Sequence, residues 1–78
     1  MKIERLKEIR EDRDLLQKDI AKMLGITQVQ YSRYETGVRI IPIYHLEKLA
    51  QFYNTSIDYL IGLTDVRKAY PKSILNQK

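Results

Sequence analysis

The chain has 78 residues, of which 44% are hydrophobic and 31% are charged, and its formal net charge is +4. This length suits one small domain, and the composition is that of a globular chain rather than a disordered one. No apolar run approaches the roughly 20 residues of a membrane span, and the first residues, MKIERLKEIRED, lack the apolar core of a signal peptide. Cysteine is absent, which excludes disulfides and thiolate metal sites. We therefore expect a cytoplasmic protein that does not contact a membrane.

The positive charge is distributed unevenly. Most of the excess follows Gly62, where Asp65 stands among the basic residues Arg67, Lys68, Lys72 and Lys78. A net charge of this size favours a polyanionic partner only weakly. Any basic contact surface in the remainder of the chain must therefore be local.

Apolar spacing predicts the first two helices. The first helix ends near residue 13, and the stripe along its inner face comprises Ile3, Leu6, Ile9, Arg10 and Arg13. The second spans residues 17–24, where Ile20 and Leu24 lie one turn apart and Gly25 follows as a stop. Ala21 provides the small side chain that a steep crossing with a following helix needs.

The stretch GITQVQYSRYETG, residues 25–37, predicts a turn and a third helix. Gly25 tolerates the positive φ of a tight turn, and Thr27 is a suitable N-cap. On a helix that begins near residue 28, Tyr31 and Tyr34 lie one turn apart, so both rings are assigned mainly to packing. Together with the preceding helix this stretch predicts a helix-turn-helix over residues 17–36.

The opposite side of the third helix has the chemistry of a major-groove reader. Gln28 can bridge the edge of adenine, Arg33 can fork onto guanine, and Val29 can contact a thymine methyl group. Ser32 falls on the same side, and Gln30 lies between the two faces. Recognition helices use their N-terminal residues in this way. For any single residue, ordinary solvation is the simpler explanation, so the prediction rests on the joint pattern.

Two further helices are predicted in the second half of the chain. One spans about residues 43–53 and follows Pro42, which is well tolerated just ahead of a helix. The other begins at Ser56, a favourable N-cap, and ends at Gly62. Residues 38–44 are rich in β-branched side chains, but Pro42 interrupts them, so no strand is predicted and the fold class is all-α.

The chain after Gly62 is predicted to be loosely held, because it combines scattered charges with Pro71. A second interpretation is that Tyr70, Ile74 and Leu75 dock on a partner subunit. The sequence leaves both interpretations open.

From residue 3 to about residue 65 the sequence resembles the Cro/C1-type (XRE-like) helix-turn-helix domains of bacterial and phage transcriptional regulators. The similarity lies in RLKEIRED, QKDIAKMLGITQVQYSRYETG and IPIYHLEKLAQFYNTSIDYLIGLTD. It implies a compact five-helix bundle of the lambda-repressor-like DNA-binding type. We expect the DNA-binding domain to span residues 1–65 and a basic C-terminal tail, disordered or involved in dimerisation, to span residues 66–78.

The resemblance implies a sequence-specific regulator of transcription, expected to be a repressor. Such a protein binds double-stranded operator DNA as a homodimer on a palindromic site and is associated with the nucleoid while bound. The base-reading positions that the resemblance implies are Thr27, Gln28, Val29, Gln30, Ser32 and Arg33. The implied phosphate contacts are Gln17, Thr36 and Arg39, and the implied structural ion pair joins Arg10 and Glu35.

Three residues depart from the family's pattern. Leu16 stands where Thr, Ser or Asn is usual, so the second helix lacks its usual N-cap, at a cost of about 1 kcal/mol. Tyr31 replaces a more usual Ile or Val, which requires a roomier pocket or a hydroxyl that reaches the surface. Val29 cannot form hydrogen bonds with a base, so specificity rests on few residues.

The sequence also bears on two other classes of function. A helix-turn-helix protein-interaction module or antitoxin-like adaptor, with DNA binding as a secondary property, fits the near-neutral charge before Gly62. An enzyme is not predicted, because His45 is the only histidine, cysteine is absent, and the acidic residues are not paired. We therefore expect no metal site, no cofactor and no small-molecule ligand.

Overall fold

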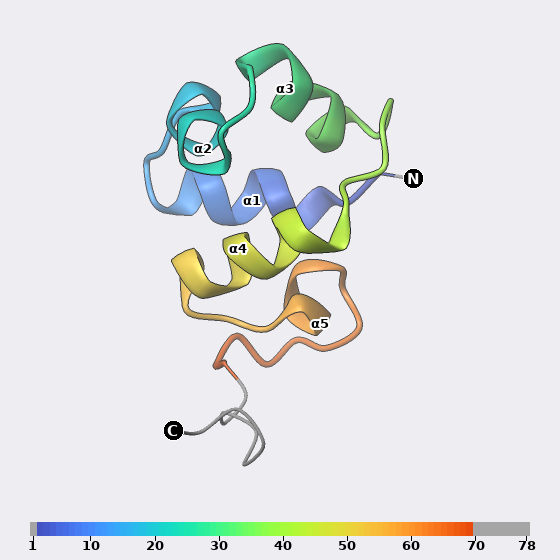
Figure 1. The fold of residues 1–78 in the computed structure, drawn as a ribbon. Helices are drawn as coiled ribbons and strands as arrows, with labels where there is room; N and C mark the ends of the chain where they lie inside the picture. The colour runs from blue at the N-terminus through green and yellow to red at the C-terminus, as the bar shows by residue number, and fades with distance from the viewer. Residues whose placement is uncertain (1, 70–78) are drawn as a thin grey trace.

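Five α-helices joined by short turns make up residues 2–69, the part of the chain that the computed structural model describes (Figure 1). They are α1 (Glu4–Asp12), α2 (Gln17–Leu24), α3 (Gln28–Thr36), α4 (Ile43–Tyr53) and α5 (Ile57–Leu60). In Figure 1, α1 lies in the middle, with α2 and α3 on one side and α4 and α5 on the other. No strand forms within residues 2–69, and the predicted all-α, five-helix fold is confirmed.

One core joins the apolar stripes of all five helices, as their spacing predicted. Tyr31 and Tyr53 are its largest fully buried side chains, and Ile41 enters it from the connection between α3 and α4. Its buried members are Ile3, Leu6, Ile9, Ile20, Ala21, Leu24, Tyr31, Ile41, Leu46, Leu49, Ala50, Tyr53, Tyr59 and Leu60. The core holds α3 by its inner edge and leaves its outer edge exposed.

The second helix begins without a side-chain cap at Leu16, as the sequence predicted. Leucine has no oxygen that can accept from the first-turn amides. Asp19 partly compensates, because its carboxylate accepts a hydrogen bond from the backbone N–H of Leu16 at 2.9 Å. This contact was not predicted from the sequence. It satisfies one of the free groups at the start of α2 and places a negative charge in the first turn, where the helix dipole favours it.

Replacing Leu16 by threonine is expected to raise the free energy of unfolding by about 1 kcal/mol. The backbone at this position already has the extended conformation of an N-cap, with φ −95° and ψ 155°. The side chain of Leu16 is 55% exposed, so little packing is lost. Urea denaturation of the two proteins measures the difference, and Leu16→Ala serves as the control that removes the leucine without adding an oxygen. A threonine variant no more stable than the alanine variant would contradict the prediction.

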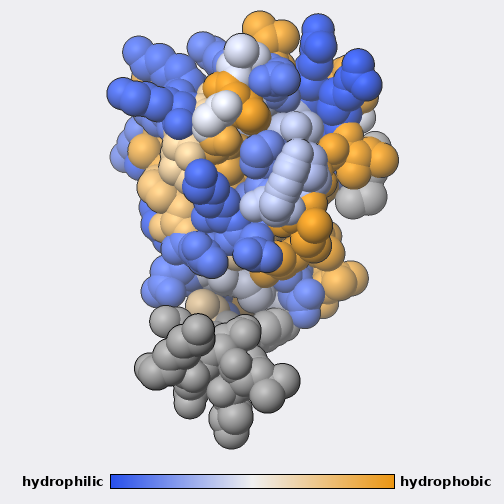
Figure 2. All heavy atoms as spheres, viewed as in Figure 1, coloured by the Kyte–Doolittle hydropathy of each residue, from blue (hydrophilic) through white to orange (hydrophobic). Residues whose placement is uncertain are grey.

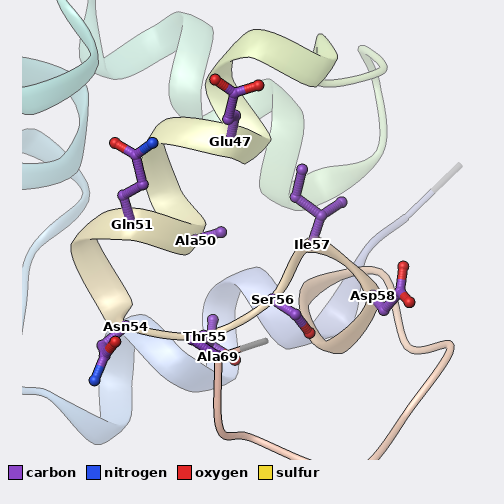
Figure 3. Close-up of a pocket in the computed structure, with 9 residues that line it drawn as sticks. All are labelled: Glu47, Ala50, Gln51, Asn54, Thr55, Ser56, Ile57, Asp58 and Ala69. Atoms are coloured by element: carbon purple, nitrogen blue, oxygen red, sulfur yellow. The ribbon is translucent and has the colours of Figure 1, made fainter. Parts of the chain in front are cut away.

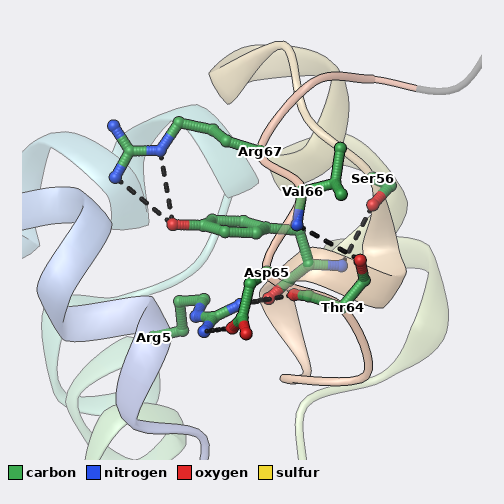
Figure 4. Close-up of polar contacts among 7 residues, drawn as sticks. Arg5, Ser56, Thr64, Asp65, Val66 and Arg67 are labelled. Atoms are coloured by element: carbon green, nitrogen blue, oxygen red, sulfur yellow. Dashed lines mark hydrogen bonds and ion pairs between the residues drawn. The ribbon is translucent and has the colours of Figure 1, made fainter.

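The chain that follows α5 is attached to α1 by Arg5 (Figure 4). The Arg5 guanidinium donates to the backbone oxygens of Tyr59 and Thr64, at 3.0 and 2.7 Å. It also forms an ion pair with Asp65 at 2.9 Å. The same guanidinium lies 4.2 Å from the centre of the Tyr59 ring, within the range of a cation–π contact.

Arg67 makes a second attachment, with its guanidinium 5.6 Å from the centre of the Tyr59 ring. Its guanidinium donates to the Tyr59 hydroxyl at 3.2 and 3.3 Å and to Asp12 at 3.3 Å. The Thr55 hydroxyl donates in turn to the backbone oxygen of Arg67. The expectation that the chain is loosely held directly after Gly62 is therefore wrong for residues 64–67.

The predictions for the remainder of the C-terminal segment stay open. Tyr70, Ile74 and Leu75, for which docking on a partner subunit was considered, lie outside the described residues. The division of the chain at residue 65 also stays a prediction.

Candidate nucleic-acid interface

A tight turn sets α3 across α2. Gly25 ends α2 with φ +74°, a left-handed conformation in which glycine avoids the steric cost of a Cβ atom. The backbone N–H of Ile26 donates to the oxygen of Ala21 at 3.0 Å, which closes the turn. The buried Ala21 and the half-buried Ile26 contribute to the shared core. These contacts fix the direction in which α3 leaves the turn.

A reciprocal pair of hydrogen bonds caps the start of α3. The hydroxyl of Thr27 accepts from the backbone N–H of Gln30 at 3.1 Å, which confirms the predicted N-cap. The Gln30 side-chain oxygen accepts from the backbone N–H of Thr27 at 3.0 Å. This is a capping box, and the spacing of threonine and glutamine three residues apart could have revealed it. The Thr27 hydroxyl and the Gln30 side-chain oxygen are therefore engaged at the helix start, whereas the Thr27 methyl group and the Gln30 amide nitrogen take part in neither capping bond.

The inner edge of α3 is formed by Tyr31, Tyr34 and Glu35. Tyr31 is fully buried, and Tyr34 is half-buried against the core. The idea that the Tyr31 hydroxyl reaches the surface is wrong, because this oxygen is buried. Burial, followed by the nearby Glu35 carboxylate, raises the pKa of Tyr31 far above its usual value. The phenol therefore stays neutral and acts as packing.

Arg10 and Glu35 form a buried ion pair between α1 and α3. Arg10 Nε donates to Glu35 Oε2 at 2.7 Å, and Arg10 Nη2 donates to Oε1 at 3.1 Å. The third nitrogen, Nη1, donates to the backbone oxygen of Leu15 at 2.8 Å. Burial by itself raises the pKa of Glu35, but the hydrogen bonds from Arg10 and other neighbours outweigh it and lower this pKa below the ordinary value. The carboxylate is thus held charged inside the protein.

Gln17 joins this network from the start of α2. Its amide nitrogen donates to Glu35 Oε1 at 3.0 Å, a contact that the sequence analysis did not predict. Residues 18 positions apart in the chain carry no local signal for such a bond. The side chain of Gln17 is half-buried and its position is therefore tied to that of α3. The backbone N–H of Gln17 at the first position of α2 has no intrahelical partner, as in any helix start.

The outer edge of α3 and the start of α2 share one hollow of about 540 Å³. Gln28 and Arg33 are exposed, Val29 is 60% exposed, and Ser32 is half-buried. The residues that line the hollow are Gln17, Gln28, Val29, Ser32 and Arg33. Five of the residues assigned to DNA contact are thus on one continuous surface.

A second hollow of about 250 Å³ lies on the other side of Arg33. It is lined by Gln30, Arg33, Tyr34, Arg39 and Ile40. The backbone N–H of Arg39 donates to the oxygen of Arg33 at 3.1 Å, which fixes the loop after α3 against the helix. Neither arginine forms an ion pair within residues 2–69. Two exposed positive charges therefore flank the outer edge of α3 without a carboxylate to neutralise them.

The two remaining assigned residues lie at the ends of α3 and outside both hollows. Thr27 caps the start, and the hydroxyl of Thr36 donates at 3.4 Å to the backbone oxygen of Arg33 near the end. Beside the interface, exposed apolar side chains follow α3, and Figure 2 shows hydrophobic residues gathered on that side of the molecule. They are Val38, Ile40, Ile43 and Tyr44.

No group of three or more His, Cys, Asp or Glu residues is placed to hold a metal ion within residues 2–69. His45 is half-buried, with its ring 4.5 Å from that of Tyr44 and 6.0 Å from that of Tyr34. Burial, and then the charge of Lys48, lower the pKa of His45. None of the described helices has the length and apolar character of a membrane span.

Two short helices are joined by a tight turn, and the second is capped at its start and exposed along one polar edge. This arrangement defines a helix-turn-helix module. Residues 6–60 match the model of the helix-turn-helix family. The chain belongs to this family, and the resemblance to Cro/C1-type domains is confirmed.

Several transcriptional regulators are similar to the chain. It is 35% identical to the uncharacterized HTH-type transcriptional regulator YobD of Bacillus subtilis over 83% of this chain and 58% of that protein. It is 38% identical to the HTH-type transcriptional regulator ImmR of Bacillus subtilis, over 94% of this chain and 58% of that protein. It is 33% identical to the cryptic phage CTXphi transcriptional repressor RstR of Vibrio cholerae, over 74% of this chain and 52% of that protein.

A solved structure shares the fold. The crystal structure of a transcriptional regulator from Listeria innocua superposes with a TM-score of 0.74 at 25% identity, covering 96% of this chain and 64% of that one. The chain spans between about half and two thirds of the length of the proteins it matches.

Proposed function

We propose that this chain is a sequence-specific, double-stranded-DNA-binding transcriptional regulator, acting as a repressor, that reads the major groove with α3. The observation that carries the proposal is the outer edge of α3, where Gln28, Val29 and Arg33 are exposed beside the start of α2. The names of the relatives, which include a repressor, support the regulatory role.

The base-reading contacts are assigned to the first turns of α3. Gln28 bridges an adenine edge, Val29 packs on a thymine methyl group, and Arg33 forks onto guanine. Ser32 lies beside them. Thr27 and Gln30, whose oxygens cap the helix, contribute through the Thr27 methyl group and through the Gln30 amide nitrogen, which takes part in neither capping bond.

The phosphate contacts are assigned to three places around α3. The first is the start of α2, where the backbone amides near Gln17 favour an anion. The second is the Arg39 guanidinium beside the second hollow. The third is Thr36 at the end of α3, whose hydroxyl would exchange its long bond to the backbone oxygen of Arg33 for one to phosphate. Contacts to the DNA phosphates would thus lie on both sides of the base-reading edge. Such contacts set the orientation of the helix on the duplex.

The DNA site is expected to be palindromic and bound by a homodimer. A two-fold dimer presents two copies of α3 about one DNA turn apart, roughly 34 Å. The cytoplasm, and the nucleoid when the protein is bound, are the compartments that this function implies. Analytical ultracentrifugation with and without duplex measures whether two chains assemble on one site.

Selection of bound duplexes from a random pool tests the proposal. Enrichment of a palindromic consensus with half-sites about 10 base pairs apart is the expected result. Recovery of duplexes without any enriched sequence would overturn the proposal of sequence-specific recognition. That outcome would favour the adaptor interpretation, in which the exposed edge of α3 contacts a protein.

A further inference from the structure

An exposed apolar patch, here called the 38–44 patch, lies directly after α3 and reaches into the first turn of α4. Four of the nine large hydrophobic side chains that are exposed within residues 2–69 fall in these seven positions, and the other five are spread along the rest of that range. The members of the patch are Val38 at 69% exposure, Ile40 at 72%, Ile43 at 67% and Tyr44 at 59%. Exposed apolar side chains that gather in this way mark a contact surface, whereas single ones need no explanation.

The 38–44 patch is continuous with the surface assigned to DNA. Ile40 lines the hollow that also contains Arg33 and Tyr34. From Tyr34 a row of rings continues across His45 to Tyr44, with ring centres 6.0 and 4.5 Å apart. The patch therefore starts at the edge of the base-reading surface and continues along the beginning of α4.

The surroundings of α3 differ between its two ends. Figure 1 shows α2 beside the start of α3, and the connection to α4 beyond its end, on the opposite side. Near the start of α2, Leu16 is the one large apolar side chain that is exposed among residues 13–18. In a two-fold complex on DNA, the end of α3 that faces the other copy lies near the two-fold axis. Of the two ends, the one beside the patch has the apolar side chains to bury there.

The spacing of half-sites brings two copies close enough to touch. The two copies of α3 in such a complex lie about 34 Å apart. The Cα atoms of one chain extend at least 23 Å in every direction. The distance that remains between the two backbones, about 10 Å, is the thickness of one layer of interlocking side chains.

The area of the patch is that of a weak contact. A side chain of this size that is about two-thirds exposed offers about 100 Å², so the patch amounts to roughly 400 Å² on each chain. Two opposed patches bury about 800 Å² together, whereas a stable protein interface buries at least about 1,200 Å². The contact is thus too small to join two chains in dilute solution, but it can act between chains that DNA already holds side by side.

Arg39 opposes the same contact when DNA is absent. It is the one charged residue among residues 38–44, it is exposed, and it forms no ion pair within residues 2–69. Two copies that meet through the patch bring two such guanidinium groups toward each other. Phosphates that bind these groups remove the repulsion, so DNA favours the contact by charge as well as by proximity.

The groove between α4 and α5, shown in Figure 3, is a less suitable place for this contact. It has a volume of about 550 Å³, and Glu47 and Gln51 lie along its α4 side. Among the described residues that line it, none belongs to α3 or to the connection after α3. A contact there would leave the 38–44 patch exposed to water beside the DNA.

We propose that a second copy of this chain docks on the 38–44 patch while both copies are bound to one operator, and that the chain is monomeric without DNA. The inference rests on the proposed function, because DNA is what brings the two copies together. The apolar side chains of one copy pack on those of the other across the two-fold axis. Binding of the first copy therefore favours binding of the second.

Cooperative binding to DNA tests the proposal. Fluorescence anisotropy compares a duplex with one half-site of the selected consensus, a duplex with two half-sites as an inverted repeat one turn apart, and a scrambled duplex. The second copy is expected to bind the two-site duplex about 5–150-fold more tightly than one copy binds the single half-site. Equal affinities for the first and the second copy would overturn the proposal.

Ile43→Ser with Tyr44→Ser removes half of the patch without changing a residue assigned to DNA. Both side chains are exposed and lie outside the core, so the circular dichroism spectrum should stay unchanged. The affinity for the single half-site is expected to stay the same, and the advantage of the second copy is expected to be lost. Full cooperativity in this variant would overturn the assignment of the patch. An equal loss of affinity for the single half-site would overturn it too, and would assign the patch to DNA.

Leu63→Ser with Val66→Ser is the matched control. It removes two apolar side chains that are 73% and 60% exposed from the chain after α5. This variant is expected to keep both the half-site affinity and the cooperativity. A loss of cooperativity equal to that of the Ile43 and Tyr44 variant would overturn the assignment to the 38–44 patch.

These measurements separate the inference from the proposed function. Binding of the single half-site no tighter than that of the scrambled duplex would overturn the proposed function, and the inference with it. Specific binding of the half-site, with two sites that fill independently, would overturn the inference alone. Analytical ultracentrifugation of the free full chain is expected to show a monomer, and a stable dimer without DNA would overturn the dependence on DNA.

Discussion

Replacing Arg10 by methionine is expected to lower the free energy of unfolding by about 3–5 kcal/mol, because it leaves a buried carboxylate without its cation. Arg10 donates twice to Glu35, at 2.7 and 3.1 Å, and once to the backbone oxygen of Leu15 at 2.8 Å. Glu35 is only 3% exposed, so little water reaches its carboxylate. Urea denaturation followed by circular dichroism measures the loss.

Two further variants isolate the cause. Lys7→Met removes a positive charge from an exposed position on the same helix and is expected to change stability by less than about 0.5 kcal/mol. Arg10→Met combined with Glu35→Leu removes both charges, and should recover most of the loss, because two apolar side chains leave no charge to solvate. A double variant as unstable as Arg10→Met alone would show that the lost packing of Arg10, rather than the unpaired carboxylate, causes the effect.

The pH dependence of stability provides another readout of this ion pair. The pKa of Glu35 in the folded protein is lower than its ordinary value of 4.5, so the folded state binds this proton less readily than the unfolded state. The corresponding stabilisation is fully present above pH 4.5 and is lost as the pH falls through the folded pKa. In Arg10→Met, burial acts without the opposing cation and should raise this pKa. Stability attributable to Glu35 then increases as the pH falls, and the sign of the dependence is reversed.

Replacing Gln28 and Arg33 together by alanine is expected to weaken binding to the selected duplex by at least about 30-fold. Each good contact to a base edge contributes about 1–3 kcal/mol of discrimination, and 1.4 kcal/mol corresponds to a factor of ten. Both side chains are exposed and neither belongs to the core, so the fold should be retained. Fluorescence anisotropy with the selected duplex and with a scrambled duplex measures the change. Specific binding that survived unaltered would mean that α3 does not read the bases.

Arg39→Ala distinguishes a phosphate contact from a base contact. It is expected to weaken binding to the selected and scrambled duplexes by the same factor and to reduce the salt slope by about 1. Lys68→Ala removes the same charge from an exposed position after α5 and should leave both affinities nearly unchanged. A loss of affinity in the Lys68 variant equal to that in the Arg39 variant would attribute the effect to net charge rather than to position.

Much of the candidate interface could be predicted because it depends on local rules. Thr27 and Ser56 were predicted as N-caps from residue type alone, and each accepts a hydrogen bond from the amide three residues on. The division of α3 into a buried Tyr31 and an exposed Arg33 follows from the helical period. The spacing of residues along one helix is enough to make such predictions.

Contacts between distant segments could not be predicted in this way. Arg5 and Asp65 are 60 positions apart, and only the packing of α1 against α5 brings them within 2.9 Å. Gln17 was assigned to phosphate, and nothing local to it indicates that its amide nitrogen donates to Glu35. The Tyr31 hydroxyl was given two possible environments, because residue type does not reveal how deep a pocket is.

The separation of the two edges of α3 has a practical consequence for altering the target of the protein. Tyr31 and Glu35 attach the helix to the core, whereas positions 28, 29, 32 and 33 line an open hollow. A combinatorial library at these four positions should therefore sample many DNA sequences on one unchanged scaffold. Position 30 is best kept constant in such a library, because the Gln30 side chain completes the cap on which the start of the helix depends.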